Sequence, residues 1–126
     1  MAQPDLREYA VEARSTDTFG RVLASCRNHH FVVDGPVQNG CPGEAVTPAE
    51  LFLAGVATCG VELLGVLARQ QGAPLTGVQV QVHGRMDRAN PVRPDLSLFN
   101  QVRLTFKLEG VTEEQAAGLI ESFKRR

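Results

Sequence analysis

Three cysteines and three histidines are the side chains in this 126-residue chain with the most chemistry to offer. Cys59 stands alone in the middle of a long apolar segment, residues 47–72. A cysteine is a nucleophile only as its thiolate, which a nearby cation, a helix N-terminus or hydrogen bonds stabilise. Two interpretations of Cys59 follow: a shielded nucleophile, or an inert core residue, as free cysteines often are.

A thiolate at position 59 needs a cation from another part of the chain. If residues 47–72 form one helix, Cys59 lies about three turns from its start, where the helix dipole contributes little. The available cations are Arg14 and Arg21, on the first predicted hairpin, and Arg27, before the third predicted strand. Glu62, three residues after Cys59 on the same face, would oppose a thiolate unless it is itself paired.

The other cysteines suggest weaker hypotheses. Cys26, His29 and His30 form a C-x-x-H-H cluster, but zinc needs three or four converging ligands. The two histidines would point to opposite faces of a strand, so we predict no metal site. Cys41 lies in a glycine-rich loop that we expect to be flexible, and it is a candidate for a second redox thiol.

The segment around Cys59 is predicted to be one helix with well-marked ends. Thr47 and Glu50 fit a capping box, and Pro48 suits the first helical position. Gly72 fits the stop. Glu50 therefore has two interpretations, a partner of Thr47 or a carboxylate that orients an arginine beside the thiol. Since apolar or small residues fall on every face, the helix should be surrounded by other structure.

Strands are predicted on both sides of this helix. Alternating or β-prone runs indicate strands at residues 6–15, 21–26, 31–34, 78–83 and 102–109, and residues 35–46 form a loop. A last helix begins at Thr112, where Gln115 completes a capping box. The order predicts an α+β fold, an antiparallel sheet with a long central helix and a second, C-terminal helix on one face.

The composition excludes several classes of function. A formal net charge of −1 gives no broad field to attract nucleic acid or anionic lipid. The apolar stretch at residues 51–68 is borderline for a membrane span, but three glycines dilute it, and we predict a core helix with no membrane partner. Unpaired cysteines and no recognisable signal peptide predict a cytoplasmic location.

The run TPAELFLAGVATC, from Thr47 to Cys59, resembles the helix motif of the OsmC/Ohr superfamily. The order of elements agrees along essentially the whole chain. The stretch VVDGP at residues 32–36, followed by Asn39-Gly40, is similar to the turn before that family's glycine-rich loop. The resemblance implies a single OsmC-like domain over residues 1–126, with the C-terminal end of the family fold missing.

The resemblance also implies an activity. In peroxidases of this superfamily the helix cysteine attacks an organic hydroperoxide and becomes a sulfenic acid, which a second cysteine resolves before a dithiol reduces the disulfide. An arginine and a glutamate assist. Carried to this chain, the catalytic candidates are Cys59, Glu50, Arg21 and Arg14. The chain departs from the family pattern in three places. Ala49 stands where the family places its glutamate, and the resolving cysteine would fall just beyond Arg126. The peroxidases' arginine has no match, because Thr18 lies in the first turn and residues 31–34 read FVVD.

Together these features predict an OsmC-like thiol-dependent peroxidase that reduces organic hydroperoxides in oxidative-stress defence. The resemblance implies a homodimer with its central helices back to back, and a dithiol as reductant. No cofactor is expected. The alternative is a non-catalytic OsmC-like dimer that binds a small hydrophobic ligand in an apolar cleft of the dimer.

Overall fold

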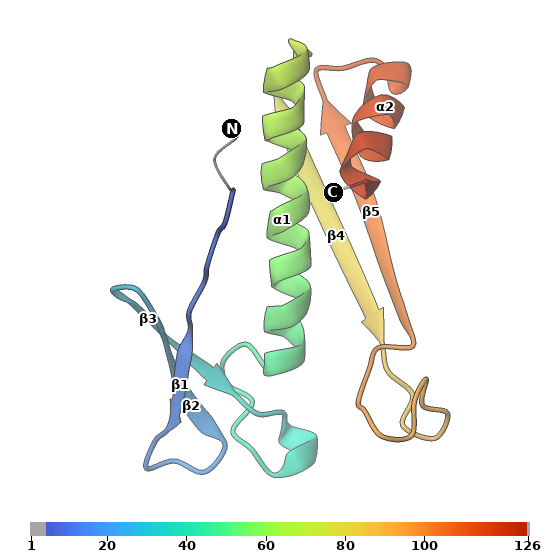
Figure 1. The fold of residues 1–126 in the computed structure, drawn as a ribbon. Helices are drawn as coiled ribbons and strands as arrows, with labels where there is room; N and C mark the ends of the chain where they lie inside the picture. The colour runs from blue at the N-terminus through green and yellow to red at the C-terminus, as the bar shows by residue number, and fades with distance from the viewer. Residues whose placement is uncertain (1–4, 126) are drawn as a thin grey trace. The chain divides into compact units, whose positions relative to one another are not determined.

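The computed structural model describes residues 5–125, which divide into two compact units, one ending at Leu51 and one beginning at Phe52 (Figure 1). The elements are β1 (Glu12–Ser15), β2 (Arg21–Cys26), β3 (His29–Asp34), η1 (Val37–Asn39), α1 (Pro48–Gln71), β4 (Gly77–Arg85), β5 (Gln101–Glu109) and α2 (Glu113–Lys124). The predicted α+β class is confirmed. The strands, however, form two antiparallel sheets, β1-β2-β3 and β4-β5, in place of the single sheet expected.

The first unit contains the three-stranded sheet. β1 is shorter than the predicted strand over residues 6–15, because its partner β2 ends before it could pair with the earlier residues. Glu12 pairs with Ser25, and β2 ends one residue later at Cys26, where the chain turns into β3. Residues before Glu12 therefore have no strand opposite them, and Tyr9 is 86% exposed. All four residues of β1 are exposed, so alternation predicted neither a covered face nor the length of this strand.

The loop after β3 is held by hydrogen bonds, contrary to the flexible loop that we expected. It contains the short 3-10 helix η1, which ends at Gly40 in the left-handed conformation. The amide of Asp34 donates to the carbonyl of Val46, and the amide of Gly43 donates to that of Gly35. The two ends of the loop are thus tied together next to β3.

α1 begins and ends where its sequence predicts. The Thr47 hydroxyl accepts from the Glu50 amide at 3.3 Å, and the Glu50 carboxylate accepts from the Thr47 amide at 3.0 Å. These reciprocal bonds form the capping box. At the other end Gly72 adopts φ 68°, and the amide of Ala73 donates to the carbonyl of Ala68. A left-handed residue after the last turn is the usual helix stop, and glycine adopts it without steric cost.

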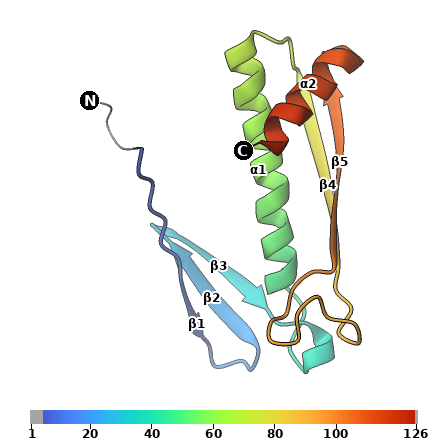
Figure 2. The same ribbon diagram turned by 45° about the vertical axis from the view of Figure 1, so that its right-hand side comes forward.

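The second unit has a small core on one side of α1. Leu64 and Leu119 are almost fully buried, and Leu67 and Ala68 are buried beside them. Partly buried residues of the β4-β5 sheet and α2 pack against this cluster: Val78, Val80, Phe106, Leu108, Ile120 and Phe123. Figures 1 and 2 both show α1 running alongside β4, with α2 beside β5. The core therefore joins both helices to the two-stranded sheet.

The two long strands and α2 also follow the predicted pattern. β4 pairs with β5 from Gly77 opposite Glu109 to Arg85 opposite Gln101, and their residues alternate between half-buried and exposed. α2 starts with a complete capping box, in which the Thr112 hydroxyl accepts from the amide of Gln115. Both helix starts could be predicted because a capping box is a local signal.

Most of the surface of α1 is uncovered. Among its 24 residues, those buried are Gly60, Leu64, Leu67 and Ala68. The helix has the length and mean hydropathy, 2.0 over its best 18-residue window, that a membrane span requires, and 22% of that window is buried. Its packing on β4 and α2 gives one face a protein environment. Within the described part of the second unit, the opposite face is apolar and uncovered.

Candidate functional site

Cys59 lies on the open face of α1. The core side of the helix is marked by Gly60, which packs against Val80 of β4, and by Leu64. Cys59 is offset by about 100° from Gly60 around the helix, and its side chain is exposed. The thiol is therefore not a core residue of its own unit, which removes one basis for the inert interpretation.

The surroundings of Cys59 on this face are mostly apolar. Positions three, four and seven residues away share a helix face, and here they include Phe52, Gly55, Glu62 and Val66. Phe52 is 59% exposed and Val66 is 39% exposed. Glu62, also exposed, forms no ion pair among residues 5–125, so no cation in the described chain offsets the opposition of its carboxylate to a thiolate.

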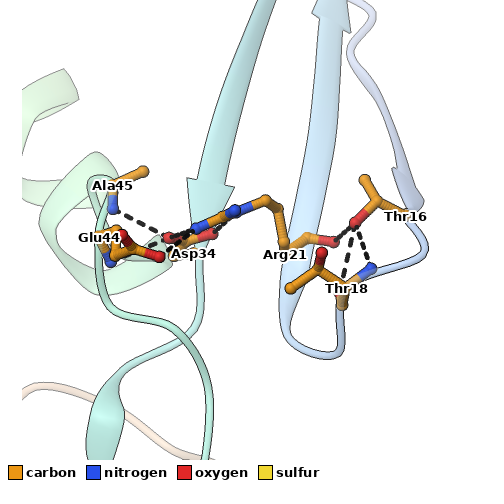
Figure 3. Close-up of polar contacts among 6 residues, drawn as sticks. All are labelled: Thr16, Thr18, Arg21, Asp34, Glu44 and Ala45. Carbon is orange, nitrogen blue, oxygen red and sulfur yellow. Dashed lines mark hydrogen bonds and ion pairs between the residues drawn. The ribbon is translucent and has the colours of Figure 1, made fainter.

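Arg21 belongs to a tight polar cluster in the first unit (Figure 3). It lies opposite Asp34 in the pairing of β2 with β3, and its guanidinium reaches the Asp34 carboxylate through two bonds, Nε–Oδ1 2.8 Å and Nη2–Oδ2 3.0 Å. Nη2 also donates to Oε1 of Glu44 at 3.0 Å. Such a planar two-bond pair fixes the direction of the guanidinium as well as its position.

The carboxylate of Asp34 has further partners that anchor the cluster to the loop. Its Oδ2 accepts from the backbone amides of Glu44 at 2.9 Å and Ala45 at 3.0 Å, and its side chain is fully buried. The hydrogen bonds from Arg21, followed by those from the two amides, lower the pKa of Asp34 to about 2. The hydrogen bonds to Asp34 and then Glu44 raise the pKa of Arg21. Both groups are charged at neutral pH.

One edge of the Arg21 guanidinium has no partner in the described part of the chain. The contacts with Asp34 and Glu44 use Nε and Nη2, and Nη1 makes no hydrogen bond among residues 5–125. The Arg21 side chain is 30% exposed. The cluster therefore holds a fixed guanidinium with one pair of N–H groups still available to an acceptor.

Arg14, the other arginine candidate, lies in a different place on the same sheet. It lines a hollow of about 270 Å³ together with Glu12, Leu23, Ser25, Arg27 and His30. Arg14 forms no ion pair within residues 5–125, whereas Arg21 has two carboxylate partners. The structure thus separates the two arginines into one fixed in a cluster and one on an open surface.

Glu50 is the capping partner of Thr47 at the start of α1. Its carboxylate accepts from the amide and the hydroxyl of Thr47, at 3.0 and 2.9 Å, and these bonds lower its pKa. No arginine contacts it in the described structure. The carboxylates that hold Arg21 are instead Asp34 and Glu44, neither of which was a candidate site residue from the sequence. Glu44 offered no signal, because its pairing with Arg21 spans 23 positions and depends on the fold of the loop.

The remaining cysteine and histidine candidates do not converge. Ser25 Oγ and His30 Nδ1 lie 2.8 Å apart across β2 and β3, whereas His29 lies opposite Cys26. Within residues 5–125 no three His, Cys, Asp or Glu side chains come close enough to hold a metal ion. His29 and His30 are neighbouring residues of β3 and therefore lie on opposite faces of the strand.

Comparisons with solved structures agree with this fold. An OsmC-like protein from Mycoplasma pneumoniae matches with a TM-score of 0.81 at 16% identity, covering 95% of this chain and 82% of the other. An organic hydroperoxide resistance protein from Elizabethkingia anophelis, with thiocyanate bound, matches at 0.67 and 22% identity, covering 94% and 82%. One from Bacillus subtilis matches at 0.56 and 22%, covering 91% and 82%. At these identities the likeness shows the fold alone.

Sequence comparison decides the family. No curated protein matches the chain significantly. The family model described as OsmC-like protein matches residues 41–126, which include the whole of α1 with Cys59, the β4-β5 sheet and the last helix. This span is more than half of the sequence. The chain belongs to the OsmC-like protein family.

Proposed function

We propose that this protein is a thiol-dependent peroxidase that reduces organic hydroperoxides through Cys59. The thiolate attacks the terminal oxygen of the hydroperoxide, the O–O bond breaks, and the alcohol leaves after taking a proton. Cys59 is thereby oxidised to a sulfenic acid. A dithiol then attacks the sulfenic sulfur and releases water. Its second thiol releases Cys59 as a thiol, and the dithiol becomes a disulfide.

The single observation that carries this proposal is the exposure of Cys59 on an apolar helix face. A peroxidatic sulfur must be reached by its substrate, and an inert core cysteine need not be. Phe52 and Val66, on the same face, are large exposed apolar side chains. Apolar surroundings favour alkyl hydroperoxides over hydrogen peroxide, because burial of the alkyl group contributes to binding. Structural relatives named as organic hydroperoxide resistance proteins support the choice of substrate class.

Arg21 is the cation we assign to the reaction. Its Nη1 edge has no hydrogen-bond partner among residues 5–125, and a fixed guanidinium is the kind of group that stabilises the negative charge of a thiolate or an alkoxide. Asp34 and Glu44 then have a positioning role, since they fix the plane of the guanidinium. Arg14 and Glu50 are weaker candidates, because the first lies on an open surface and the second is engaged with Thr47.

A second copy of the chain is the proposed cover for the open face of α1. Exposed apolar surface of this extent on a helix commonly marks an interaction site. The chain has a formal net charge of −1, so repulsion between two copies is small. In such a dimer Phe52, Cys59 and Val66 would lie near the partner helix. The substrate pocket would then be completed by both subunits.

The assay that tests the proposal measures loss of tert-butyl hydroperoxide with dithiothreitol as the reductant. The parent should consume the hydroperoxide, and should reduce hydrogen peroxide more slowly. Cys59→Ser should be inactive, while Cys26→Ser, a matched change of a half-buried cysteine in β2, should keep the activity. Arg21→Lys should lower the rate although it keeps the charge, because lysine lacks the planar pair of donors. Consumption that survives Cys59→Ser rules out the proposed mechanism.

A hollow beside α1 favours one alternative, a non-catalytic protein that binds a small hydrophobic ligand. It measures about 320 Å³ and is lined by Ala57, Thr58, Val61, Glu62 and Val80. Most of this lining is apolar, as ligand sites commonly are. Binding of a fluorescent alkyl probe that is lost in Val61→Asp, in a protein without peroxidase activity, would favour the alternative.

A further inference from the structure

The side chain of Cys41 is seated between two glycines at the edge of the first sheet. A Cβ atom placed on Gly20 would lie 2.5 Å from Cys41 Sγ, and one placed on Gly35 would overlap the same sulfur. A Cβ atom and a sulfur atom cannot approach this closely without a bond. The sulfur of Cys41 therefore fits only because positions 20 and 35 are both glycine. Cys41 itself is half-buried.

These two glycines are the chain neighbours of the ion pair. Gly20 immediately precedes Arg21, and Gly35 immediately follows Asp34. The amide of Gly35 donates to the carbonyl of Gly20 at 2.8 Å, which joins the two strand ends beside the sulfur. The size of the side chain at position 41 therefore acts directly on the backbone that carries Arg21 and Asp34.

The same residue also shapes the loop that delivers the other partners of the pair. The amide of Cys41 donates to the carbonyl of Pro36 at 3.3 Å, which closes the turn over η1. Gly43 then donates to Gly35, and the amide of Glu44 reaches the Asp34 carboxylate at 2.9 Å. Cys41 is thus the residue at which the loop turns back toward β2 and β3.

We propose that Cys41 is a positioning residue: its side chain, fitted between Gly20 and Gly35, sets the geometry of the Arg21–Asp34 pair. In this role the sulfur reacts with nothing and binds no ligand. It fills a gap whose width decides whether the guanidinium stays in plane with the carboxylate. The relevance to catalysis rests on the proposed function, in which Arg21 assists Cys59.

This role can be tested by enlarging the side chain at position 35 or 41 and then reducing the other to compensate. Gly35 does not have a left-handed backbone, so alanine is tolerated there except for its overlap with Cys41. Gly35→Ala should therefore distort the pair, and Cys41→Met should do the same from the other side. The double variant Gly35→Ala with Cys41→Gly should relieve the overlap, because the next atom, the carbonyl oxygen of Gly20, is 3.5 Å away.

The readout is the pKa of Asp34, measured from its carboxyl carbon by NMR. Asp87 is an internal control, because its lowered pKa depends on its own turn with Asn90 and Ala89 in the second unit. In Gly35→Ala and Cys41→Met the pKa of Asp34 should rise from about 2 toward about 3.9, while that of Asp87 stays low. In the double variant it should return to the parent value.

Hydroperoxide reduction is the second readout. The rate of hydroperoxide reduction should fall about tenfold in the single variants and recover in the double variant. Loss of residues that orient a metal ligand has effects of this size. Cys26→Ser, the thiol control in the same sheet, should change neither readout. An unchanged pKa of Asp34 in both single variants overturns the proposal. If Gly35→Ala fails to fold, rescue by Cys41→Gly supports it and failure of that rescue overturns it. A parent protein without peroxidase activity overturns the proposed function but leaves the NMR test of Cys41 decisive.

Discussion

Arg21 and Asp34 face one another as register partners of β2 and β3 and are joined by two hydrogen bonds of 2.8 and 3.0 Å. A fully buried carboxylate would be costly alone, since burial penalises its charged form. Here the guanidinium and two loop amides compensate that cost. The pair therefore ties the first sheet to the loop after β3, and it also holds the candidate catalytic cation.

Asp34→Asn should change how the stability of the protein depends on pH. The pKa of Asp34 is about 2 in the folded chain and about 3.9 when unfolded, so its contribution is complete above pH 4. The contribution is lost as the pH falls through about 4 to about 2, because the unfolded state then binds the proton more readily. Urea unfolding of parent and variant across this range should show a steeper loss in the parent.

The control for this prediction is Asp17→Asn, an exposed residue of the turn between β1 and β2. It should keep the pH profile of the parent. A parent and an Asp34→Asn variant with the same slope between pH 4 and pH 2 would mean that the pair does not form in solution.

Gly60→Val should destabilise the second unit. A Cβ atom added to Gly60 would lie 3.3 Å from Cγ2 of Val80. A branched side chain therefore cannot fit without moving β4. Overpacking of this kind typically costs about 1–3 kcal/mol. Gly118→Ala in α2 is the contrasting change, because a Cβ there meets nothing within 4 Å, and it should stabilise by roughly 0.5–1 kcal/mol. Thermal or urea unfolding of the two variants should give shifts of opposite sign.

Leu64→Ala and Leu119→Ala should each be strongly destabilising. Both side chains are almost fully buried, at 0% and 1% exposure, and they belong to the same core between α1 and α2. Truncation of a buried leucine costs about 2–5 kcal/mol through lost burial and the cavity left behind. Leu98→Ala, in the loop between β4 and β5 and 42% exposed, should cost much less. Equal losses from all three would contradict this core.

Val66→Glu should abolish the proposed association of two copies. Val66 is on the open face of α1, where a carboxylate between two apolar helices would be unpaired. The molar mass by light scattering should fall from twice the 13.7 kDa chain mass to the single mass. Val92→Glu, in the loop after β4 and 56% exposed, should remain dimeric. A parent that is already monomeric, or a Val66→Glu variant that stays dimeric, contradicts the proposed dimer.

Local signals in the sequence predicted most elements of the fold. The limits of α1 followed from Thr47, Glu50 and Gly72, and the faces of β4 and β5 followed from their alternation. Each of these signals acts within a few residues. The division of the strands into two sheets had no such signal, because alternation fixes which face is buried and not which strand is the neighbour.

The site was predictable only in part. Cys59 was selected as an isolated thiol in an apolar helix, and Arg21 as one of three arginines near the first predicted strands, and their catalytic roles stay predictions. Glu44 and Cys41 could not be assigned their contacts, since these depend on how the loop folds back onto the sheet. The capping role of Glu50 was one of two interpretations, and the hydrogen bonds to Thr47 identify which one the structure adopts.

The most direct test of the account is the chemical state of Cys59 after one equivalent of tert-butyl hydroperoxide. The parent, treated without a reductant and trapped with dimedone, should carry the label on the peptide that contains Cys59, as seen by mass spectrometry. The peptides with Cys26 and Cys41 should stay unlabelled. If Cys59 remains unlabelled while the hydroperoxide is consumed, or is labelled no faster than Cys26, then Cys59 is not the peroxidatic residue.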